Sequence, residues 1–420
     1  MVITEINKHL TTLKTWVTVP HNSDFSIYNL PFGIFSVNGD APKAGIAIGE
    51  LIVDLEAISE LGLISVDASY FKQKTLNEFI SLGKKITNKV RLDIQNLLIS
   101  ENSPLKNHPE VFVLQNDVKM HLPVHVGDYS DFYSSIEHAT NAGKMFRDPE
   151  NALLSNWRHI PVGYHGRASS IVVSGTDIHR PMGQVKTNDM EVPVFKASGN
   201  LDFELEMGFV VGKSTELGER VSTKDADEHI FGLVLFNDWS ARDIQKWEYV
   251  PLGPFLGKSF ASSMSPWIVT LEALEPFRVQ GPEQKPEVLS YLAYEGERNY
   301  DIQLEVGMSS PTSEETTIST SNFKFMYWNM MQQLAHHTVN GCNINVGDVM
   351  ASGTISGKDE SSYGSLLEIS WGGKKPFELK DGSKRTFIED NDTVTMRGFA
   401  EKDGKRVGFG QVTGTILPSK

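Results

Sequence analysis

Cysteine is almost missing from this chain of 420 residues, which contains only Cys342. A single thiol excludes an internal disulfide and a zinc site built from several cysteine thiolates, and it fits a reducing compartment. Cys342 lies in an Asn-Gly-Cys-Asn context, which is more typical of a turn or a small core residue than of a nucleophile. We therefore expect the chemistry of the protein to depend on other side chains.

Long apolar runs and basic stripes are missing too. No run of about 18 apolar residues is present to cross a bilayer, and residues 1–19 lack the apolar core and cleavage site of a secretion signal. Lys and Arg number 39 against 53 Asp and Glu, a net charge of −14, and they are scattered along the chain. The sequence therefore predicts a cytoplasmic protein that binds neither membranes nor nucleic acid.

Regular alternation of strands and helices is also absent, and there is no repeat of fixed period. Both absences disfavour a doubly wound parallel sheet and favour a mainly β or α+β fold. A polar segment with two prolines, residues 101–110, interrupts the pattern and suits a domain boundary. We predict an N-terminal domain over residues 1–110 and a larger, β-rich domain over residues 111–420 that carries the functional residues.

The first domain begins with short β-rich runs. Residues 29–37 and 45–55 have this character, and a Gly49-Glu50 turn divides the second run like a hairpin. The pattern Thr75-x-x-Glu78 is typical of a capping box and predicts one helix that continues through residue 97. A small barrel or sheet with a helix follows from these signals. At the other end of the chain, residues 391–417 alternate like two or three antiparallel strands.

Residues 201–212 form the most informative stretch. Apolar residues alternate there with Asp202, Glu204 and Glu206, so a β-strand would place three carboxylates on one face. Side chains on one face of a strand repeat about every 7 Å, close enough to share a cation. Two interpretations stay open at this point: a solvated face of an antiparallel strand, or a site where a divalent metal relieves the repulsion.

A continuous apolar run at residues 231–237 predicts a buried strand that ends in Asp238. Residues 239–249 follow with a helical pattern, and Arg242, Gln245 and Tyr249 would share one face of that helix. The face could be an ordinary solvated surface. A cation, an amide and a phenol beside Asp238 would also suit binding a carboxylate or polarising a carbonyl group.

A second helix is predicted over residues 130–143, with Ser130 as its cap and Gly143 as its stop. Asp131 and His138 would then face the same way about 10 Å apart, too far for a direct contact. The spacing leaves room for substrate between a metal held by Asp131 and a base at His138. The alternative for His138 is an ordinary polar helix residue.

Other short patterns are weaker. The segment Gly353 to Lys358 lacks the spacing of a phosphate loop, and no nucleotide or hydrolase elbow motif is present. Pro123 breaks the helix that a metal-binding pair of His121 and His125 would need. A helix is predicted over residues 322–339, in which adjacent His336 and His337 face different ways, so at most one can reach a site.

Longer segments carry a specific resemblance. They are residues 131–135 and 138–141, residues 161–170 (Pro-Val-Gly-Tyr-His-Gly-Arg-Ala-Ser-Ser), Glu-Leu-Glu at 204–206, residues 237–259, and residues 351–357 (Ala-Ser-Gly-Thr-Ile-Ser-Gly). Together they resemble the fumarylacetoacetate hydrolase family, and the likeness extends over nearly the full chain, from residue 28 to residue 411. The run at 237–259 is far more specific than a short motif.

The resemblance implies a fold, an activity and an assembly. The fold is a small SH3-like N-terminal barrel followed by a large β-rich domain of the mixed β-roll type. The activity is metal-dependent hydrolysis of a carbon-carbon bond, which splits 4-fumarylacetoacetate, a diketo acid, into fumarate and acetoacetate at the end of tyrosine and phenylalanine breakdown. The expected assembly is a homodimer, and the expected cofactor is Ca²⁺, Mg²⁺ or both.

The resemblance also implies residue roles. Four acids become the metal ligands: Asp131, Glu204, Glu206 and Asp238. His138 becomes the catalytic base, Glu368 orients it, and Arg242, Gln245 and Lys258 stabilise negative charge. The substrate-binding set is Tyr133, Arg147, Tyr164, Arg242, Gln245, Tyr249 and Thr354. A second cation subsite would include Asp238, Lys258 and Ser262, where Ser262 replaces the threonine expected there. Asp202 is left without a role.

Two rival functions remain open at the level of sequence. One is another enzyme of the same superfamily, such as an acylpyruvate hydrolase, a decarboxylase or a hydratase acting on a related oxo acid. The other is a protein without catalytic activity in which a structural cation holds the acidic strand and the Arg242 face binds a partner. Removal of the cation separates them, since the second predicts lost stability and no activity to lose.

Overall fold

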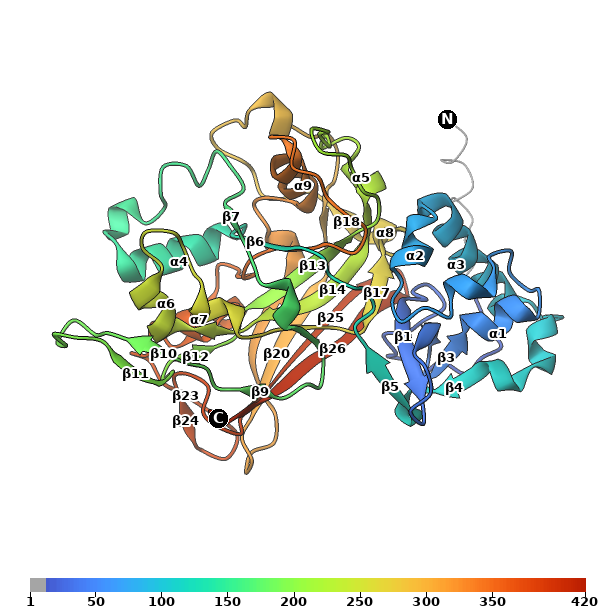
Figure 1. Ribbon diagram of the computed structural model, residues 1–420, viewed down its shortest axis with the longest axis horizontal. Coiled ribbons are helices and arrows are strands. Elements are labelled where there is room, and N and C mark those ends of the chain that lie inside the picture. The colour runs from blue at the N-terminus through green and yellow to red at the C-terminus, as the bar shows by residue number, and fades with distance from the viewer. Residues whose placement is uncertain (1–12) are drawn as a thin grey trace.

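The computed structural model describes residues 13–420, so the prediction that residues 1–19 form no secretion signal falls partly outside the described residues. The N-terminal part of the chain, blue to cyan in Figure 1, lies at one end of the molecule beside a larger β-rich part. Within residues 13–420, no helix combines the length and the apolar character needed to span a membrane. The mainly β, α+β fold class predicted from the sequence is confirmed.

The N-terminal part is built on an antiparallel sheet. Its first strands are β1 (Phe32–Val37), β2 (Lys43–Ile48) and β3 (Leu51–Asp54). The predicted hairpin at Gly49-Glu50 is confirmed, because Ile48 pairs with Leu51 across it and Gly49 has a φ of +57°. A left-handed φ is what the first position of such a two-residue turn requires.

The helices of the N-terminal part are α1 (Leu55–Glu60), α2 (Asn77–Ser81) and α3 (Lys84–Ile99). The single helix predicted to start at a capping box on Thr75 is wrong. Two helices occupy that range, and Gly83, with a φ of +89°, separates them. The α3 helix buries Val90, Ile94 and Leu98 against the sheet. Short 3-10 turns connect these elements: η1 (Ala68–Tyr70), η2 (Pro104–Asn107) and η3 (Pro109–Val111).

Two strands that follow residue 110 still belong to the N-terminal sheet. Strand β4 (Phe112–Leu114) pairs with β3, and β5 (Val118–His121), which follows η4 (Gln115–Asp117), pairs with β1. The division at residue 110 stays a prediction, and this pairing favours a boundary about a dozen residues later. The sheet does not stop there, because β1 also pairs with β17 (Trp267–Thr270) of the larger part.

The sheet of the larger part brings the functional segments together. Strand β14 (Ile230–Asp238) is buried over its whole length, as predicted, and pairs with β13 (Leu205–Val211), β16 (Ser262–Met264) and β17. The order continues from β13 through β22 (Val349–Ala351) and β6 (Tyr129–Phe132) to β7 (Gly163–His165), and β16 also pairs with β8 (Ile171–Val173). Side chains from distant segments therefore meet at one end of this sheet.

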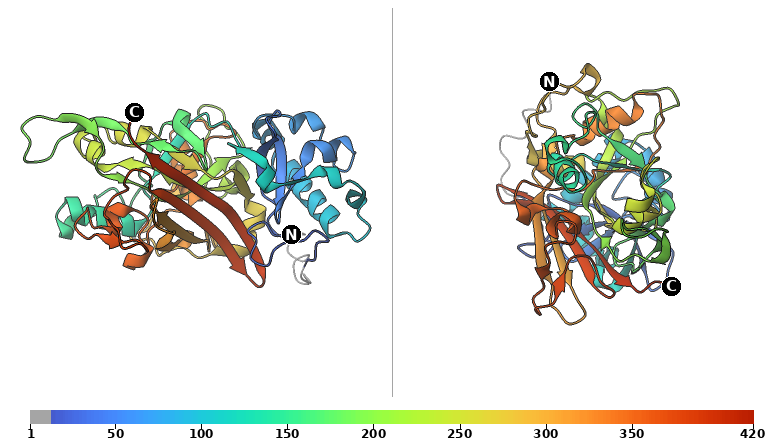
Figure 2. Two further views of the ribbon diagram at one scale, coloured as in Figure 1. Left: turned by 90° about the horizontal axis from the view of Figure 1, so that it is seen from below. Right: turned by 90° about the vertical axis from the view of Figure 1, so that its left-hand side faces the viewer.

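A second sheet of five strands packs against the first. It consists of β21 (Thr316–Asn322), β20 (Gln303–Ser309), β25 (Thr393–Lys402), β26 (Lys405–Leu417) and β9 (Ile178–His179). Strands β25 and β26 confirm the antiparallel pair predicted within residues 391–417, and they form the long red hairpin of Figure 2. Leu235 of one sheet and Met396 and Val412 of the other belong to one buried apolar core.

Several further elements belong to neither of these two sheets. They are η5 (Pro149–Asn151), η6 (Ala168–Ser170), β10 (Met182–Val185), β11 (Val194–Ala197), α5 (Ala226–His229), α8 (Leu271–Leu274), η7 (Glu275–Phe277), β18 (Arg278–Val279), η8 (Ser290–Leu292), β19 (Asn299–Tyr300), η10 (Glu360–Ser362), β23 (Phe377–Glu378) and β24 (Lys384–Arg385). The helix predicted over residues 322–339 is wrong in its first half. Asn322 ends β21, η9 (Phe323–Phe325) follows, and α9 (Met330–Thr338) begins after the cap Asn329.

Candidate active site

Four acidic side chains converge at the end of the central sheet. Asp131 lies in β6, Glu206 in β13 and Asp238 at the last position of β14, while Glu204 lies between β12 (Leu201–Asp202) and β13. All four are buried, and one oxygen from each lies within 4.8 Å of the others. The structure therefore brings together the four acids that the resemblance implies as metal ligands.

The strand that supplies two of these acids differs from the prediction. Residues 201–211 are buried without exception, so the interpretation of a solvated acidic face is wrong. The strand is also interrupted after Asp202, and Glu204 makes only an isolated bridge to Ser365 before β13 begins. The β13 strand lies between β14 and β22, and its two faces are covered by two apolar clusters, one containing Met207 and Phe209 and the other containing Val210.

Two cations neutralise part of the acidic cluster. Lys258, on α7 (Leu256–Ser259), donates to Glu204 and, over 2.7 Å, to Asp238. Arg242 is the first residue of α6 (Arg242–Glu248), and its guanidinium lies 2.8 Å from Glu204. Although burial opposes ionisation, Lys258 and Arg242 together hold the pKa of Glu204 well below its usual value. Glu204 is thus a firmly ionised member of the cluster.

The other side of the cluster is not neutralised. Burial, reinforced by the neighbouring carboxylates, raises the pKa values of Asp131 and Glu206 well above their usual range. Asp131 Oδ1 and Glu206 Oε1 are buried and have no hydrogen-bond partner among residues 13–420. With all four carboxylates ionised, the two cations, one of which also pairs with Asp202, leave an excess of at least two negative charges. Orphaned oxygens and a charge excess of that size fit a divalent cation, and an all-oxygen donor set suits Ca²⁺ or Mg²⁺.

Asp238 has further contacts. The hydroxyl of Ser262 donates to its Oδ1 over 2.7 Å, and that of Tyr164 donates to its Oδ2 over 3.0 Å. Lys258 and Ser262 thus both contact Asp238, as the predicted second subsite requires, although its occupancy by a cation stays a prediction. A cavity of about 160 Å³ opens beside this carboxylate, lined by Tyr129, Tyr164, His165, Gly166, Arg167, Asp238, Pro254, Phe255, Lys258 and Ser259.

A buried dyad lies next to the cluster. His138 Nδ1 is 2.7 Å from Glu368 Oε2, and both side chains are almost completely inaccessible to solvent. His138 is on α4 (Ile136–Phe146), which begins after Ser135, whose hydroxyl accepts from the backbone N–H of His138. Glu368 is on the short α10 (Leu366–Ile369). The contact leaves Nε2 of His138 as the ring nitrogen able to act on substrate.

This geometry corrects the predicted helix over residues 130–143. Tyr129–Phe132 is strand β6, which pairs with β22 and β7, and the helix starts only at Ile136. Strand pairing therefore overrides the helical pattern around Ser130. Gly143 does not end the helix but lies inside it, where a Cβ atom would clash with the backbone carbonyl of Ala152. Asp131 and His138 come from two different elements joined by a short bend.

Glu368 is held by more than the imidazole. Its Oε2 accepts from the hydroxyls of Ser356 (2.8 Å) and Ser365 (3.1 Å), and its Oε1 accepts from Asn141 (2.9 Å). Burial raises the pKa of Glu368. His138 and the hydrogen bonds from Asn141 and Ser356 lower it by a larger amount, so the pKa lies below its usual value. The carboxylate stays ionised and fixes the orientation of the ring. Sequence reasoning missed Asn141 and Ser356, although both lie in the segments that carried the resemblance.

The predicted substrate-binding residues differ in how close they lie to the dyad and the cluster. Arg242 Nη1 donates to Gln245 Oε1 over 3.3 Å, so these two share a face of α6 as expected, although the helix is shorter than residues 239–249. The ring of Tyr133 meets that of His138 edge to face, with centroids 5.3 Å apart. Thr354 is buried in the segment after β22. These residues surround the dyad and the cluster.

Two other predicted residues are placed differently. The guanidinium of Arg147 donates twice to the carbonyl of Ala152, with a shorter distance of 2.7 Å, so its hydrogen bonds are structural. Tyr249 follows the last residue of α6 and is 50% exposed. Their roles toward substrate stay predictions.

The segment Gly353 to Lys358 and the pair His336 and His337, which gave only weak sequence motifs, make specific contacts in the structure. The backbone N–H of Gly353 donates to Glu206 Oε2 over 3.1 Å, so the segment taken as a false phosphate loop supports an acid of the cluster. His337 contacts the hydroxyl of Ser130 at 2.9 Å, whereas His336 contacts Tyr291. As predicted, the two histidines face different ways.

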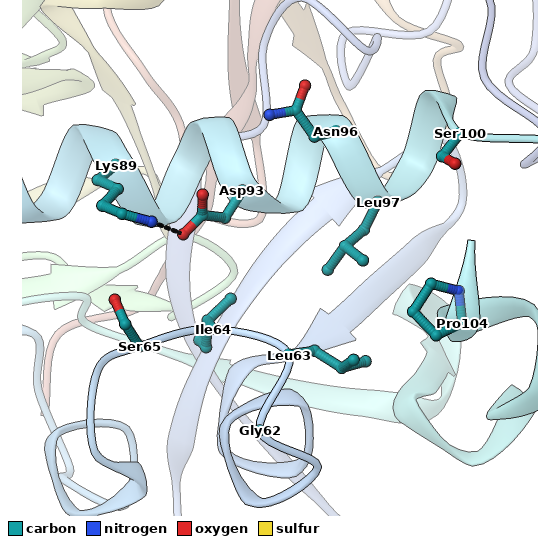
Figure 3. A pocket seen from close by; sticks show the side chains of 10 residues that line it. All are labelled: Gly62, Leu63, Ile64, Ser65, Lys89, Asp93, Asn96, Leu97, Ser100 and Pro104. Carbon is teal, nitrogen blue, oxygen red and sulfur yellow. Dashed lines mark hydrogen bonds and ion pairs between the residues drawn. The ribbon is translucent and has the colours of Figure 1, made fainter. Parts of the chain in front are cut away.

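A second hollow lies far from this chemistry, in the N-terminal part. Figure 3 shows it between α3 and the segment after α1, with a volume of about 470 Å³. The ion pair of Lys89 and Asp93 lies on its rim (Figure 3), and both residues come from α3. It has no cluster of buried ionisable groups, in contrast to the end of the central sheet.

The sequence of this chain is similar to those of known proteins over nearly its whole length. Residues 129–417 match the family described as fumarylacetoacetate (FAA) hydrolase C-terminal, and residues 28–123 match fumarylacetoacetase N-terminal. The human protein named fumarylacetoacetase is 52% identical over 414 residues, which cover 96% of this chain and 99% of that protein. The proteins of the same name from Dictyostelium discoideum and Arabidopsis thaliana are each 51% identical over 98% and 97% of this chain and 99% of their own lengths.

Solved structures show the same fold at much lower identity. A fumarylacetoacetate hydrolase from Exiguobacterium antarcticum superposes with a TM-score of 0.54 at 17% identity, covering 93% of this chain and 99% of that one. A maleylpyruvate hydrolase from Sphingobium superposes with a TM-score of 0.51 at 12% identity, covering 93% and 100%. With two family profiles matching nearly all of residues 28–417 and relatives about half identical over their full lengths, the chain belongs to the fumarylacetoacetate hydrolase family.

Proposed function

We propose that the protein hydrolyses the carbon-carbon bond of 4-fumarylacetoacetate and releases fumarate and acetoacetate. The observation that carries the proposal is the juxtaposition of a buried His138–Glu368 dyad with a four-acid cluster that includes two orphaned oxygens. The full-length identity of about half to proteins named fumarylacetoacetase supports the choice of substrate. The enzyme would act last in tyrosine and phenylalanine breakdown.

Asp131, Glu204, Glu206 and Asp238 would hold Ca²⁺ or Mg²⁺. When bound, the ion would act as a Lewis acid on the 1,3-dicarbonyl part of the substrate and favour departure of the acetoacetate portion as an enolate. The chain itself prepares the acids for this role. Gly353 fixes Glu206, while Lys258 and Ser262 fix Asp238, so the carboxylates are oriented before any ligand arrives.

His138 serves as the general base. Its Nδ1 is held by Glu368, so its Nε2 takes a proton from water, and the hydroxyl oxygen bonds to the carbonyl carbon next to the breaking bond. When the carbon-carbon bond breaks, its electron pair leaves with the acetoacetate portion. His138 then returns the proton to that carbon, so that fumarate gains the hydroxyl group and acetoacetate gains the hydrogen.

Arg242, Gln245 and Lys258 stabilise the negative charge that develops on oxygen. Nη2 of Arg242 is buried and has no partner among residues 13–420, so it is free to donate to substrate. Burial tends to lower the pKa values of Arg242 and Lys258, but the acids around them raise both above their usual values. Both groups therefore stay cationic throughout turnover. Such fixed donors are the largest single source of rate enhancement in many enzymes.

We further propose that the enzyme is a cytoplasmic homodimer. The lone Cys342 fits a reducing compartment. Val250, Leu252 and Phe255 are 66%, 96% and 69% exposed, and such a group of apolar side chains in one loop suits burial against a second copy. Light scattering at several protein concentrations tests the dimer.

The test of the proposed function is a direct assay. Purified protein is mixed with fumarylacetoacetate, and the absorbance of the conjugated diketo group is followed with and without a chelator. We expect the absorbance to disappear, chelation to stop the loss, and Ca²⁺ or Mg²⁺ to restore it. Persistence of the absorbance with metal present would move the assignment to another oxo acid substrate of the same family.

A further inference from the structure

Asp202 is the one acid of the stretch 201–206 that does not belong to the metal cluster. It is 0% exposed, yet both of its oxygens accept hydrogen bonds. Oδ1 accepts from the backbone N–H groups of Phe203 (2.8 Å) and Leu366 (2.7 Å). Oδ2 accepts from the N–H of Leu367 (2.9 Å) and from Nε of Arg242 (2.8 Å). Four donors thus converge on a single buried carboxylate.

The donors belong to two different parts of the active site. Nε of Arg242 is fixed by Asp202, while Nη1 contacts Glu204 and Gln245 and Nη2 has no partner among residues 13–420. Because the guanidinium is planar, fixing Nε and Nη1 also fixes the direction in which Nη2 can donate. Asp202 therefore determines where the free donor of Arg242 lies.

Two of the backbone donors to Asp202 belong to the helix that holds Glu368 of the dyad. Leu366 and Leu367 are the first two residues of α10, and Glu368 is the third. Their N–H groups have no partner inside the helix, so the carboxylate of Asp202 satisfies them. The position of Glu368, and through it the ring of His138, depends on this anchoring of the chain.

We propose that Asp202 is a positioning residue that holds the free donor of Arg242 and the Glu368–His138 dyad in one fixed arrangement. This inference rests on the proposed function. Oxyanion donor and base must act on the same carbonyl group, so their separation has to be set to within a fraction of an ångström. Asp202 can set this separation directly, because its carboxylate accepts hydrogen bonds both from Arg242 and from the start of the helix that holds Glu368.

The chemistry of the contacts explains why the residue is an acid. A carboxylate offers two acceptor oxygens, whereas the amide of asparagine offers one oxygen and places an NH₂ group against donors. In Asp202→Asn, the NH₂ group would face either Leu366 and Phe203 or Leu367 and Arg242. In the first orientation the hydrogen bond to Leu366 is lost, and in the second those to Leu367 and Arg242 are lost. The side-chain volume changes little in either case.

The experiment compares Asp202→Asn with the wild type in full steady-state kinetics on fumarylacetoacetate. We expect kcat to fall roughly 10- to 100-fold, since a displacement of about 1 Å can cause a loss of this size. We expect KM to change by less than about threefold, because the aligned donor and base matter most in the transition state. The affinity for Ca²⁺, measured by calorimetry, should stay close to that of the wild type, because the four cluster acids are unchanged.

Asp392→Asn is the matched control. Asp392 is also 0% exposed, accepts from Nε (2.8 Å) and Nη2 (3.0 Å) of Arg385, and accepts from the N–H of Glu389 (2.8 Å). Each of the two variants removes the charge of a buried aspartate that is paired with an arginine. Both should lower the midpoint of thermal unfolding, but Asp392→Asn should leave kcat within about twofold of the wild type.

A double variant separates positioning from general loss of stability. If Asp202 acts through the dyad, combining Asp202→Asn with Glu368→Gln should reduce kcat by clearly less than the product of the two single effects. A kcat within twofold of the wild type for folded Asp202→Asn, or an equal fall for Asp392→Asn, would overturn the proposal. If Asp202→Asn does not fold, Asp202→Glu, which keeps the charge but shifts the oxygens by one methylene, is judged by the same criteria. An inactive wild type would instead overturn the proposed function.

Discussion

The dyad and the acidic cluster lie side by side, but they reach their ionisation states in opposite ways. Glu368 is surrounded by donors, and its pKa lies below the usual value. Asp131 and Glu206 are surrounded by other acids, and their pKa values lie far above it. The dyad is held by hydrogen bonds from the chain itself, whereas the ionised cluster carries excess negative charge that protons or a divalent cation can neutralise.

Removal of His138 should have the largest effect on the dyad alone. We expect His138→Ala to lower kcat by at least about 10³-fold, because it removes the imidazole that Glu368 orients as the proposed base. Calorimetric titration with Ca²⁺ should give nearly the wild-type affinity. His336→Ala, which removes a half-buried histidine that contacts Tyr291, is the control and should keep normal kinetics. A near-normal rate for His138→Ala would refute the assignment of the base.

Glutamine substitutions should affect the two regions differently. Glu368→Gln removes a carboxylate that accepts from His138, Asn141 and two serines, so we expect a loss of roughly 1.5–3 kcal/mol in unfolding free energy. Its kcat should fall about 10²-fold or more, because the ring of His138 loses its orientation. Thermal unfolding in the presence of a chelator, together with kinetics, measures both effects.

Glu206→Gln should behave in the opposite sense. It replaces a carboxyl group whose ionisation burial and acidic neighbours oppose, so the chelated protein should unfold at the same temperature as the wild type or higher. Affinity for Ca²⁺ should fall about 10- to 100-fold, since one ligand charge is lost. A chelated Glu206→Gln variant that is much less stable than the chelated wild type would contradict the contrast between the two regions.

Metal affinity should rise with pH. The raised pKa values of Asp131 and Glu206 mean that the protein without metal keeps protons on them where these groups are normally ionised, and a cation must displace those protons. By the same linkage, the folded form without metal binds more protons than the unfolded chain, so its stability should decrease as pH rises. Calorimetry in buffers of different ionisation enthalpy should detect proton release. Equal affinity at about pH 6 and about pH 8 would contradict this prediction.

The smallest effect is expected at Ser262. Its hydroxyl donates to Asp238 over 2.7 Å, and Ser262→Thr keeps that donor while adding a methyl group at a buried position. We expect kcat and Ca²⁺ affinity to change by less than about threefold. Ser262→Ala is the comparison, because it leaves Asp238 Oδ1 without this donor and should weaken the cation site more.

Several local features could be predicted from the sequence because they depend on near neighbours. The turn at Gly49, the buried strand ending at Asp238 and the paired strands within residues 391–417 follow from alternation and from turn residues. Helix boundaries were less accurate. The helix predicted from Ser130 failed because residues 129–132 pair with β22 and β7, and pairing with distant strands leaves no trace in local periodicity.

The candidate site shows the same division. Alternation placed Asp202, Glu204 and Glu206 together, and the resemblance selected the two glutamates, but nothing local to residues 201–206 distinguishes the three acids. Tertiary structure decided their fates: Asp202 meets Arg242 and the start of α10, Glu204 meets two cations, and Glu206 meets other acids. The sequence by itself determined which side chains carry the charges. Only folding decided their ionisation and their roles, because burial and the nearest charges, brought from distant segments, set the energy of each carboxylate.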